Sequence, residues 1–191
     1  STRQSVRGDS PVGFGGRVNL YYGSRGEMGM SSNFNYRKQG FAVNVNVGMG
    51  YNQYESDGYS NRTNIYTDSS NQLKINSNSV SKTLRPNFRF NLDYDLNKRN
   101  TVNFVAQYNQ NEFDNSGFNR YKNLNRFDSI SKLSERTVAT DGYNRSPSLN
   151  FTYTHKGKTA GEQLRIIASY NIGWNKNVRN FFQEFLNADD T

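Results

Sequence analysis

A strict alternation of side chains begins at Phe41 and limits what this chain can fold into. Successive residues of a β-strand point to opposite faces of a sheet, so an alternating sequence gives a strand two chemically different faces. A helix would scatter the asparagines of this stretch around its axis. The stretch is about as long as a tilted strand that crosses a bilayer. Large apolar residues alternate with polar or very small ones: Phe41, Val43, Val45, Val47, Met49 and Tyr51 against Ala42, Asn44, Asn46, Gly48, Gly50 and Asn52.

The same period of two recurs along the chain. Seven such runs, separated by turn-type residues, predict an all-β protein. The main departures are the apolar residues Tyr21, Val105 and Ile167, which fall in polar positions. The apolar members of the other six runs are Val18, Leu20 and Tyr22; Met28, Met30, Phe34 and Tyr36; Phe88, Phe90, Leu92 and Tyr94; Val102, Phe104, Ala106 and Tyr108; Leu149, Phe151 and Tyr153; and Leu164, Ile166, Ala168, Tyr170, Ile172 and Trp174.

The composition combines low hydrophobicity with many aromatic residues. Only 33% of the 191 residues are hydrophobic and the mean hydropathy is −0.94, values typical of disordered chains. An aromatic content of 14% argues against disorder. The wall of a membrane barrel explains both features, because only every second residue faces lipid. We therefore predict an antiparallel up-and-down meander that forms part of a transmembrane β-barrel.

Several classes of function are excluded by residue content. The chain has no cysteine and one histidine, which argues against a disulfide framework, a thiolate site or a histidine-rich metal site. The net charge of +8 invites a nucleic-acid partner, but the basic residues are spread along the chain and through its turns. We expect no nucleic-acid binding, no cofactor, no metal and no enzymatic activity.

The connections between the runs differ in length. Outer-membrane barrels have short turns on the periplasmic side and longer loops outside. We assign the connections accordingly from residue 37 onward, where short and long ones alternate, and the short connection at 24–26 breaks this rule. The long ones are predicted to continue as ribbons that turn at 68–71 and 128–131. Pro86 and Pro147 are expected at strand starts, where proline is tolerated. The short connections are 24–26, 37–40, 97–100 and 156–161, and the long ones are 54–81 and 112–141.

The chain divides into three parts at this level. Residues 1–14 form a polar lead-in, residues 15–183 form a barrel wall of about seven strands, and residues 184–191 form a polar tail or the start of another loop. The sequence begins Ser-Thr-Arg and does not show the charged and then apolar pattern of a signal peptide. We expect the chain to be a piece of a larger protein.

Three hairpin sequences resemble those of a known family. Residues 31–41 read SSNFNYRKQGF, residues 90–101 read FNLDYDLNKRNT, and residues 150–158 read NFTYTHKGK. These are similar to hairpins of TonB-dependent outer-membrane receptors from Bacteroidetes-type bacteria. The resemblance extends from about Gly15 to Trp174.

The resemblance implies a location, a role and partners. It places the chain in the bacterial outer membrane, in contact with lipid, as a non-catalytic wall segment of a receptor that imports a nutrient such as a metal chelate or an oligosaccharide. Energy would come from the TonB system, acting through an N-terminal part outside this segment. Large transporters of this kind have twenty-two strands around a plugged lumen.

Four short motifs have simpler interpretations than the functions they suggest. The triplet 7–9 (Arg-Gly-Asp) matches an adhesion motif, but three residues recur often by chance. Gly13, Gly15 and Gly16 lack the Lys-Ser/Thr pair of a phosphate loop. The carboxylates of Glu55, Asp57 and Asp68 match no calcium loop and are interpreted as solvated loop charge. The pair Asp93 and Asp95 is interpreted as lumen-facing, with Arg89 as a counter-charge, rather than as an acid–base pair.

The alternation assigns individual side chains to surfaces. Tyrosine and tryptophan prefer the headgroup level of a membrane, and they lie at the ends of the runs with phenylalanine between them. We predict a lipid-facing set of Val43, Val45, Val47, Phe88, Phe90, Phe104, Phe151 and Ile166. The predicted lumen-facing set is Asn44, Asn46, Arg89, Asn91, Asp93, Asn103, Gln107 and Arg165. The predicted aromatic girdle is Tyr36, Tyr51, Tyr94, Tyr108, Tyr153 and Trp174.

Two other classes of protein share these features. One is a soluble β-sheet module that binds ligands at a surface, as lectins and adhesins do. The other is an outer-membrane barrel without a transport function. Sorting of tyrosine from phenylalanine by height favours a membrane wall over a soluble core.

Overall fold

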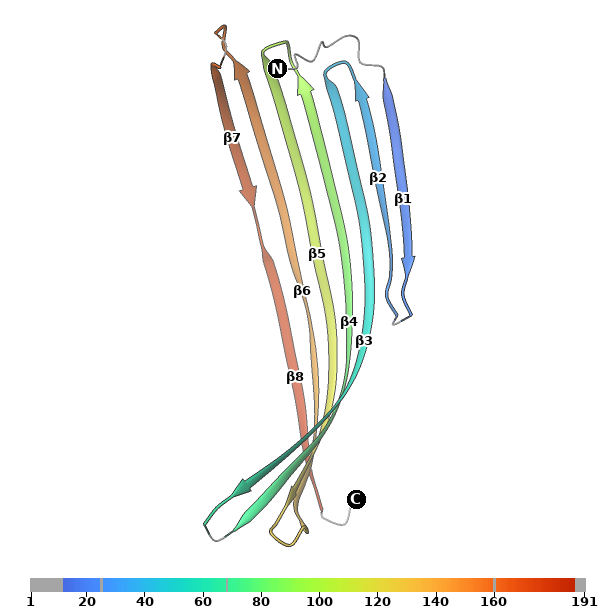
Figure 1. Ribbon diagram of the computed structural model, residues 1–191, viewed down its shortest axis with the longest axis vertical. Helices are drawn as coiled ribbons and strands as arrows, with labels where there is room; N and C mark the ends of the chain where they lie inside the picture. The colour runs from blue at the N-terminus through green and yellow to red at the C-terminus, as the bar shows by residue number, and fades with distance from the viewer. Residues whose placement is uncertain (1–11, 25, 68, 160, 188–191) are drawn as a thin grey trace, which may run out of the picture.

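The chain forms one antiparallel β-sheet. The computed structural model describes residues 12–24, 26–67, 69–159 and 161–187. Figure 1 shows the strands side by side along the long axis of the molecule. They are β1 (Gly13–Tyr22), β2 (Met28–Lys38), β3 (Phe41–Ile65), β4 (Ser70–Asp95), β5 (Asn100–Leu124), β6 (Ile130–Lys156), β7 (Gln163–Asn171) and β8 (Trp174–Leu186). The predicted all-β antiparallel meander is confirmed.

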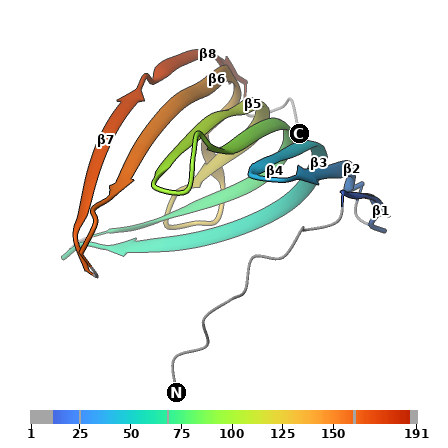
Figure 2. The ribbon, with the colours of Figure 1, turned by 90° about the horizontal axis from the view of Figure 1, so that it is seen from above.

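Neighbours in the sequence are neighbours in the sheet, with one exception. The order is β1-β2-β3-β4-β5-β6-β7, and β8 also pairs with β6. β7 pairs with residues 148–156 of β6, and β8 pairs with residues 133–145. The two strands therefore continue one another along one edge, and eight strands fill seven positions. Seen from above, the sheet is a curved, open arc with β1 and β7 at its two ends (Figure 2).

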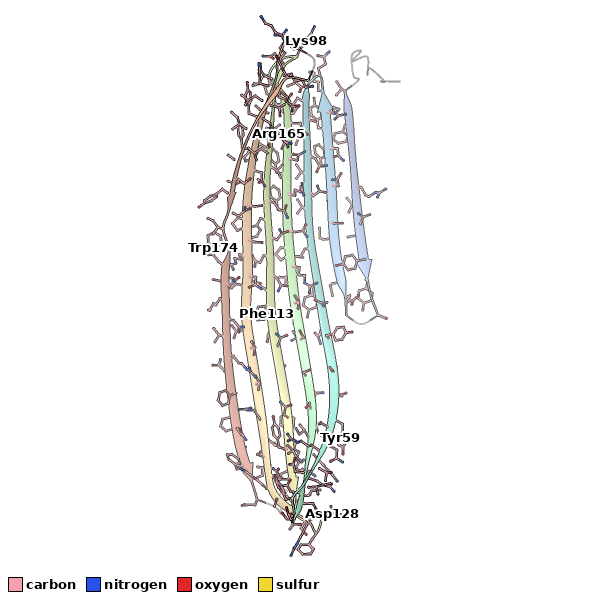
Figure 3. The ribbon with its side chains drawn as sticks, turned by 60° about the vertical axis from the view of Figure 1, so that its left-hand side comes forward. Tyr59, Lys98, Phe113, Asp128, Arg165 and Trp174 are labelled. Atoms are coloured by element: carbon pink, nitrogen blue, oxygen red, sulfur yellow. The ribbon has the colours of Figure 1, made fainter. Side chains whose placement is uncertain are left out.

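The two ends of the sheet are built differently. The turns β2–β3, β4–β5 and β6–β7 lie at one end, and the long β3–β4 and β5–β6 hairpins reach the other (Figure 1). Figure 3 accordingly places Lys98 and Asp128 at opposite ends of the molecule. The expectation that the long connections continue as ribbons is confirmed, since β3 and β4 stay paired out to Ile65 and Ser70. The β1–β2 turn points the same way as the ribbons but ends far short of them.

The ribbon turns come slightly earlier than the sequence predicts. In the first ribbon, Tyr66 N donates to Ser69 O at 2.8 Å, and Ser70 already belongs to β4. In the second, Asn125 Oδ1 accepts from the backbone N–H groups of Phe127 (2.9 Å) and Ser129 (3.1 Å). β6 then begins at Ile130. An asparagine side chain that satisfies backbone donors in this way is a typical turn former.

The strand limits differ from the three-part division expected from the sequence. β1 starts at Gly13, inside the segment expected to be a lead-in, and β8 extends to Leu186, inside the expected tail. β8 forms although its sequence does not alternate, because the distal part of β6 offers unpaired backbone. Two aromatic rings of β8 make cation–π contacts with residues of β6. The guanidinium carbon of Arg136 lies 4.9 Å from the centroid of the Phe181 ring, and Lys132 Nζ lies 4.6 Å from the centroid of the Phe185 ring.

The sheet has almost no core of its own. Among the described residues, the buried hydrophobic side chains are Leu124 and Leu133, at the far end of the β5–β6 hairpin. Central residues such as Val47 and Phe88 remain 48% and 40% exposed. A single layer covers neither of its faces, so most apolar side chains of the described sheet remain at least partly exposed.

The prolines do not stand at strand starts, so that expectation is wrong. Pro86 and Pro147 lie inside β4 and β6, at points where pairing lapses on one side. The β4–β5 register skips residues 85 and 86, and the β6 edge is unpaired at 146 and 147, between β7 and β8. Ile172 N still donates to Pro147 O at 3.1 Å. The reciprocal bond is missing because proline has no N–H group.

Replacing Pro147 with valine should close the gap between β7 and β8. The new N–H group can donate to the Ile172 carbonyl, adding one ladder hydrogen bond worth about 0.5–1.5 kcal/mol. Amide hydrogen exchange measured by NMR should then slow at Ile172 and Trp174. Exchange in the β2–β3 pair serves as the control and should not change. Unaltered exchange at Ile172 would show that proline is not the cause of the gap.

Candidate functional site

The register brings the apolar residues of all seven strand positions onto one face. Residues directly opposite one another in an antiparallel pair share a face. We call the face that carries Val45 the apolar face and the face that carries Asn46 the polar face. The row through Val45 illustrates the alignment: Phe34, Val45, Phe90, Ala106, Leu149 and Tyr170.

The predicted surface residues sort onto these faces. Every residue of the predicted lipid-facing set and of the predicted girdle falls on the apolar face by its register, and every residue of the predicted lumen-facing set falls on the polar face. Figure 3 shows Arg165 and Trp174 on the β7–β8 edge, with Arg165 nearer the short turns. The register thus joins residues that are far apart in the sequence into two continuous surfaces.

An apolar band without charged side chains crosses the sheet. It comprises the apolar-face residues between the short turns and a limit that falls across the sheet, from Tyr51 in β3 and Leu84 in β4 to Tyr108 in β5 and Pro147 in β6. Its polar members are few, and Ser32 is one of them. Charged groups on this face appear only beyond the band, for example Lys82, Glu112 and Asp141. By strand, the band covers alternate residues of 14–22, 28–36, 41–51, 84–94, 102–108, 147–153 and 164–170.

Tyrosine hydroxyls mark both limits of the band. At the short-turn limit, Tyr153 OH donates to Asn100 Oδ1 at 2.6 Å. At the opposite limit, Tyr51 OH donates to Gln53 Oε1 at 3.2 Å, and Tyr108 OH donates to Gln110 Oε1. These rings lie with apolar residues while their hydroxyls bond amides outside the band. This is the orientation that tyrosine adopts where an apolar phase meets a polar one.

Aromatic contacts connect neighbouring strands within the band. The Phe41 ring lies 6.1 Å from the Tyr36 ring and 6.2 Å from the Tyr94 ring, both edge-on. Phe90 and Phe104 lie 6.3 Å apart. Pairs of this kind stabilise cross-strand packing by about 0.5–1.5 kcal/mol beyond the area they bury. They hold β2, β3, β4 and β5 in one register without a second layer.

Asparagine side chains form a network on the polar face. Asn33 Nδ2 donates to Asn46 Oδ1 and Asn46 Nδ2 donates to Asn44 Oδ1, each at 2.6 Å. Asn44 donates to Asn35, and Asn35 donates to Asn33, which closes a ring of four amides across β2 and β3. Each amide uses both a donor and an acceptor, so this surface is polar without being charged.

A second polar cluster contains the predicted carboxylate pair. Asp93 accepts from Asn103 Nδ2 at 2.7 Å and from Asn91 Nδ2 at 3.2 Å, and Asn103 also donates to Asn91 Oδ1 at 2.9 Å. Asp95 accepts from Thr101 Oγ1 at 2.9 Å. Both carboxylates therefore lie in hydrogen-bonded positions on the polar face. Arg89 shares that face and lies across from Asn46 and Gln107.

The sequence exceptions Tyr21, Val105 and Ile167 lie on the polar face. Tyr21 covers two glycines of the neighbouring strands: a Cβ on Gly29 would lie 2.4 Å from its ring, and one on Gly50 would lie 2.9 Å from its hydroxyl. Tyrosine fits here because these positions lack side chains. The small residues of the alternation therefore make room for Tyr21, a role that the period alone does not reveal.

The short motifs acquire no new function. The triplet 7–9 and Asp68 lie outside the described residues. Gly13, Gly15 and Gly16 are part of β1. Asp57 Oδ1 accepts from Asn78 at 2.7 Å, and Glu55 accepts from Gln53 at 3.1 Å. In the described ranges, no group of three or more His, Cys, Asp or Glu side chains is placed to hold a metal ion.

The described part of the chain contains no helix long and apolar enough to cross a membrane. Compared with models of known protein families, the chain matches none, and a comparison with curated proteins finds no similar sequence.

Replacing Asn103 with alanine should destabilise the sheet. The change removes both hydrogen bonds that this side chain donates to Asn91 and Asp93, at an expected cost of about 1–3 kcal/mol. Urea unfolding in detergent micelles, followed by circular dichroism, measures the cost. Asn109 is an exposed asparagine on the same face of the same strand, and Asn109→Ala should cost much less. An equal loss of unfolding free energy in the two variants would show that the hydrogen bonds of Asn103 do not stabilise the sheet.

Proposed function

We propose that the chain is a wall segment of an outer-membrane β-barrel, with the apolar face against lipid and the polar face toward the lumen. The uncharged apolar band that crosses all seven strand positions carries this proposal. Lipid is the partner that would cover such a band evenly, because a hydrocarbon phase needs no complementary shape. A partner protein would require matching knobs and holes.

In β3, the height of the band fits a membrane. Eleven residues from Phe41 to Tyr51 extend about 33 Å along the strand. A tilt of about 40° reduces this to about 25 Å, the height of the apolar band on outer-membrane barrels. The tyrosine hydroxyls at the two limits support the same placement.

The open edges agree with a segment rather than a complete barrel. β1 at one edge, and β7 and β8 at the other, each pair with a single neighbour in the described sheet. Seven positions are far fewer than a plugged lumen needs. By the family resemblance, the whole would be a TonB-dependent receptor that imports a nutrient such as a metal chelate or an oligosaccharide. This chain would supply wall, lumen surface and external ribbons, and no catalysis.

Arginine substitutions at adjacent residues test which face meets lipid. Val45→Arg places a charge in the middle of the band and should cost about 2–4 kcal/mol of folding free energy in a bilayer. Asn46→Arg places the same side chain on the polar face, where we expect a much smaller loss. Urea-induced unfolding in lipid vesicles measures both. Equal losses would contradict the assignment of faces.

The proposed topology places the β2–β3, β4–β5 and β6–β7 turns in the periplasm, and the ribbons and the β1–β2 turn on the outer side. An epitope inserted after Ser69, at the end of the β3–β4 ribbon, should be labelled by antibody on whole cells that carry the full-length protein. An epitope at Lys98 should be labelled only after the cells are permeabilised. The opposite pattern would invert the orientation while leaving the faces unchanged.

A further inference from the structure

A hollow lies where the β1–β2 turn ends beside the longer strand β3. Its volume is about 690 Å³, and its lining includes Tyr22, Met28, Tyr51, Gln53, Tyr54 and Glu55. The hollow exists because β2 starts opposite Tyr51 whereas β3 continues to Ile65. This volume lies within the range of about 300–1,000 Å³ that is typical of small-molecule sites.

Three lining residues form a platform on the apolar face. Tyr22, Met28 and Tyr51 lie opposite one another in adjacent strands. Strands are about 4.8 Å apart, so the two tyrosines flank the methionine at a separation of about 10 Å. Tyr22 is 79% exposed and Met28 is 47% exposed. The platform offers ring faces and a thioether to a ligand with an apolar surface of its own.

Hydrogen-bond acceptors follow this platform along β3, at Gln53 and Glu55. Tyr51 OH donates to Gln53 Oε1 at 3.2 Å, and Gln53 Nε2 donates to Glu55 Oε1 at 3.1 Å. This chain of bonds uses the tyrosine hydroxyl donor and one of the two amide N–H groups of Gln53. It leaves lone pairs on the carboxylate and on the tyrosine oxygen. A ligand that suits the hollow therefore combines an apolar face with several hydrogen-bond donors.

We propose that this hollow binds the sugar ring of a glycolipid headgroup. A sugar ring has a C–H face that packs on tyrosine and hydroxyls that donate to carboxylate and phenol oxygens. The proposal rests on the proposed function, because the platform lies at the upper limit of the band assigned to lipid. A headgroup there would keep its acyl chains on the band below. Most of the lining lies on the apolar face and Tyr54 lies on the polar face, so the hollow lies at the edge of β3 beyond the β1–β2 turn.

An alkylammonium headgroup is the competing ligand. Tyrosines beside a carboxylate also attract such cations through cation–π contacts. The acceptors spaced along Tyr51, Gln53 and Glu55 suit several hydroxyls better than one charge.

Titration in mixed micelles tests the proposal. The 191-residue chain is folded in polyoxyethylene detergent, which carries neither sugar nor charge, and circular dichroism verifies the sheet. Dodecyl maltoside is then added while NMR follows the methyl groups of Met28, Met30 and Met49. Dodecylphosphocholine, with the same alkyl chain, and free maltose are the comparison probes. We expect a saturable shift at Met28 with dodecyl maltoside, larger than the shifts at Met30 and Met49.

Variants assign the response to the hollow. Tyr22→Ala should weaken the apparent affinity for dodecyl maltoside about tenfold, the loss of one stacked ring. Tyr170→Ala, an equally simple truncation on the same face at the other edge of the sheet, should not change the affinity. Tyr22 and Tyr170 are both highly exposed, so neither change should unfold the sheet.

The possible failures are distinguishable. A chain that forms no sheet in micelles would contradict the proposed function and remove the basis of the site with it. A folded sheet without a saturable Met28 shift would overturn the site alone. A stronger response to dodecylphosphocholine would replace the sugar with an ammonium group. Equal affinity for free maltose would overturn the glycolipid as the source of the sugar.

Discussion

Strand register is the constraint on which the other features of this sheet depend. Side chains alternate between faces with a period of two, so a slip of one residue in any pair would move every side chain of that strand to the opposite face. Short turns prevent such a slip. The backbone is left-handed at Gly40, with φ of 76°, and Gly40 O accepts from Asp95 N at 2.6 Å, which ties the β2–β3 turn to β4. In the same way, Lys156 N donates to Arg99 O at 2.8 Å.

The fixed register turns short patterns into continuous surfaces. No single run could create a band across seven strand positions, and the charge-free zone exists only because Phe34, Val45 and Phe90 share a row. The same alignment closes the ring of four asparagines on the other side. The apolar face therefore carries a band without charged side chains, and on the polar face four asparagine amides hydrogen-bond to one another. These two faces support the proposed placement of the sheet between lipid and an aqueous lumen.

The sequence predicts the strands and their faces where the alternation is strong. Val43, Val45 and Val47 leave little choice, because a period of two is compatible only with a strand. The predictions were less accurate where tertiary pairing decides the outcome. β8 has aromatic neighbours at Phe181 and Phe182, which point to opposite faces and leave no clear period. It forms because β6 provides a free edge.

The places of the prolines and of the hollow could not be predicted from the sequence either, because both depend on how the strands pair. Pro147 is acceptable inside β6 because its missing donor faces a neighbour that loses only one hydrogen bond. Which side of the strand the proline faces follows from the register. The hollow at Tyr22 depends on the unequal lengths of β2 and β3, and those lengths follow from pairing in three dimensions. No sequence motif marks it.

The pairing order also bears on how such a sheet assembles. Each described strand bonds to its predecessor or successor, apart from the return of β8 to β6, and the sheet has almost no common core. Stability in such a system is close to a sum of nearest-neighbour terms, as in repeat proteins. The sheet can therefore grow hairpin by hairpin from a first pair such as β3–β4, and damage to an outer strand should fray that edge without dissolving the centre.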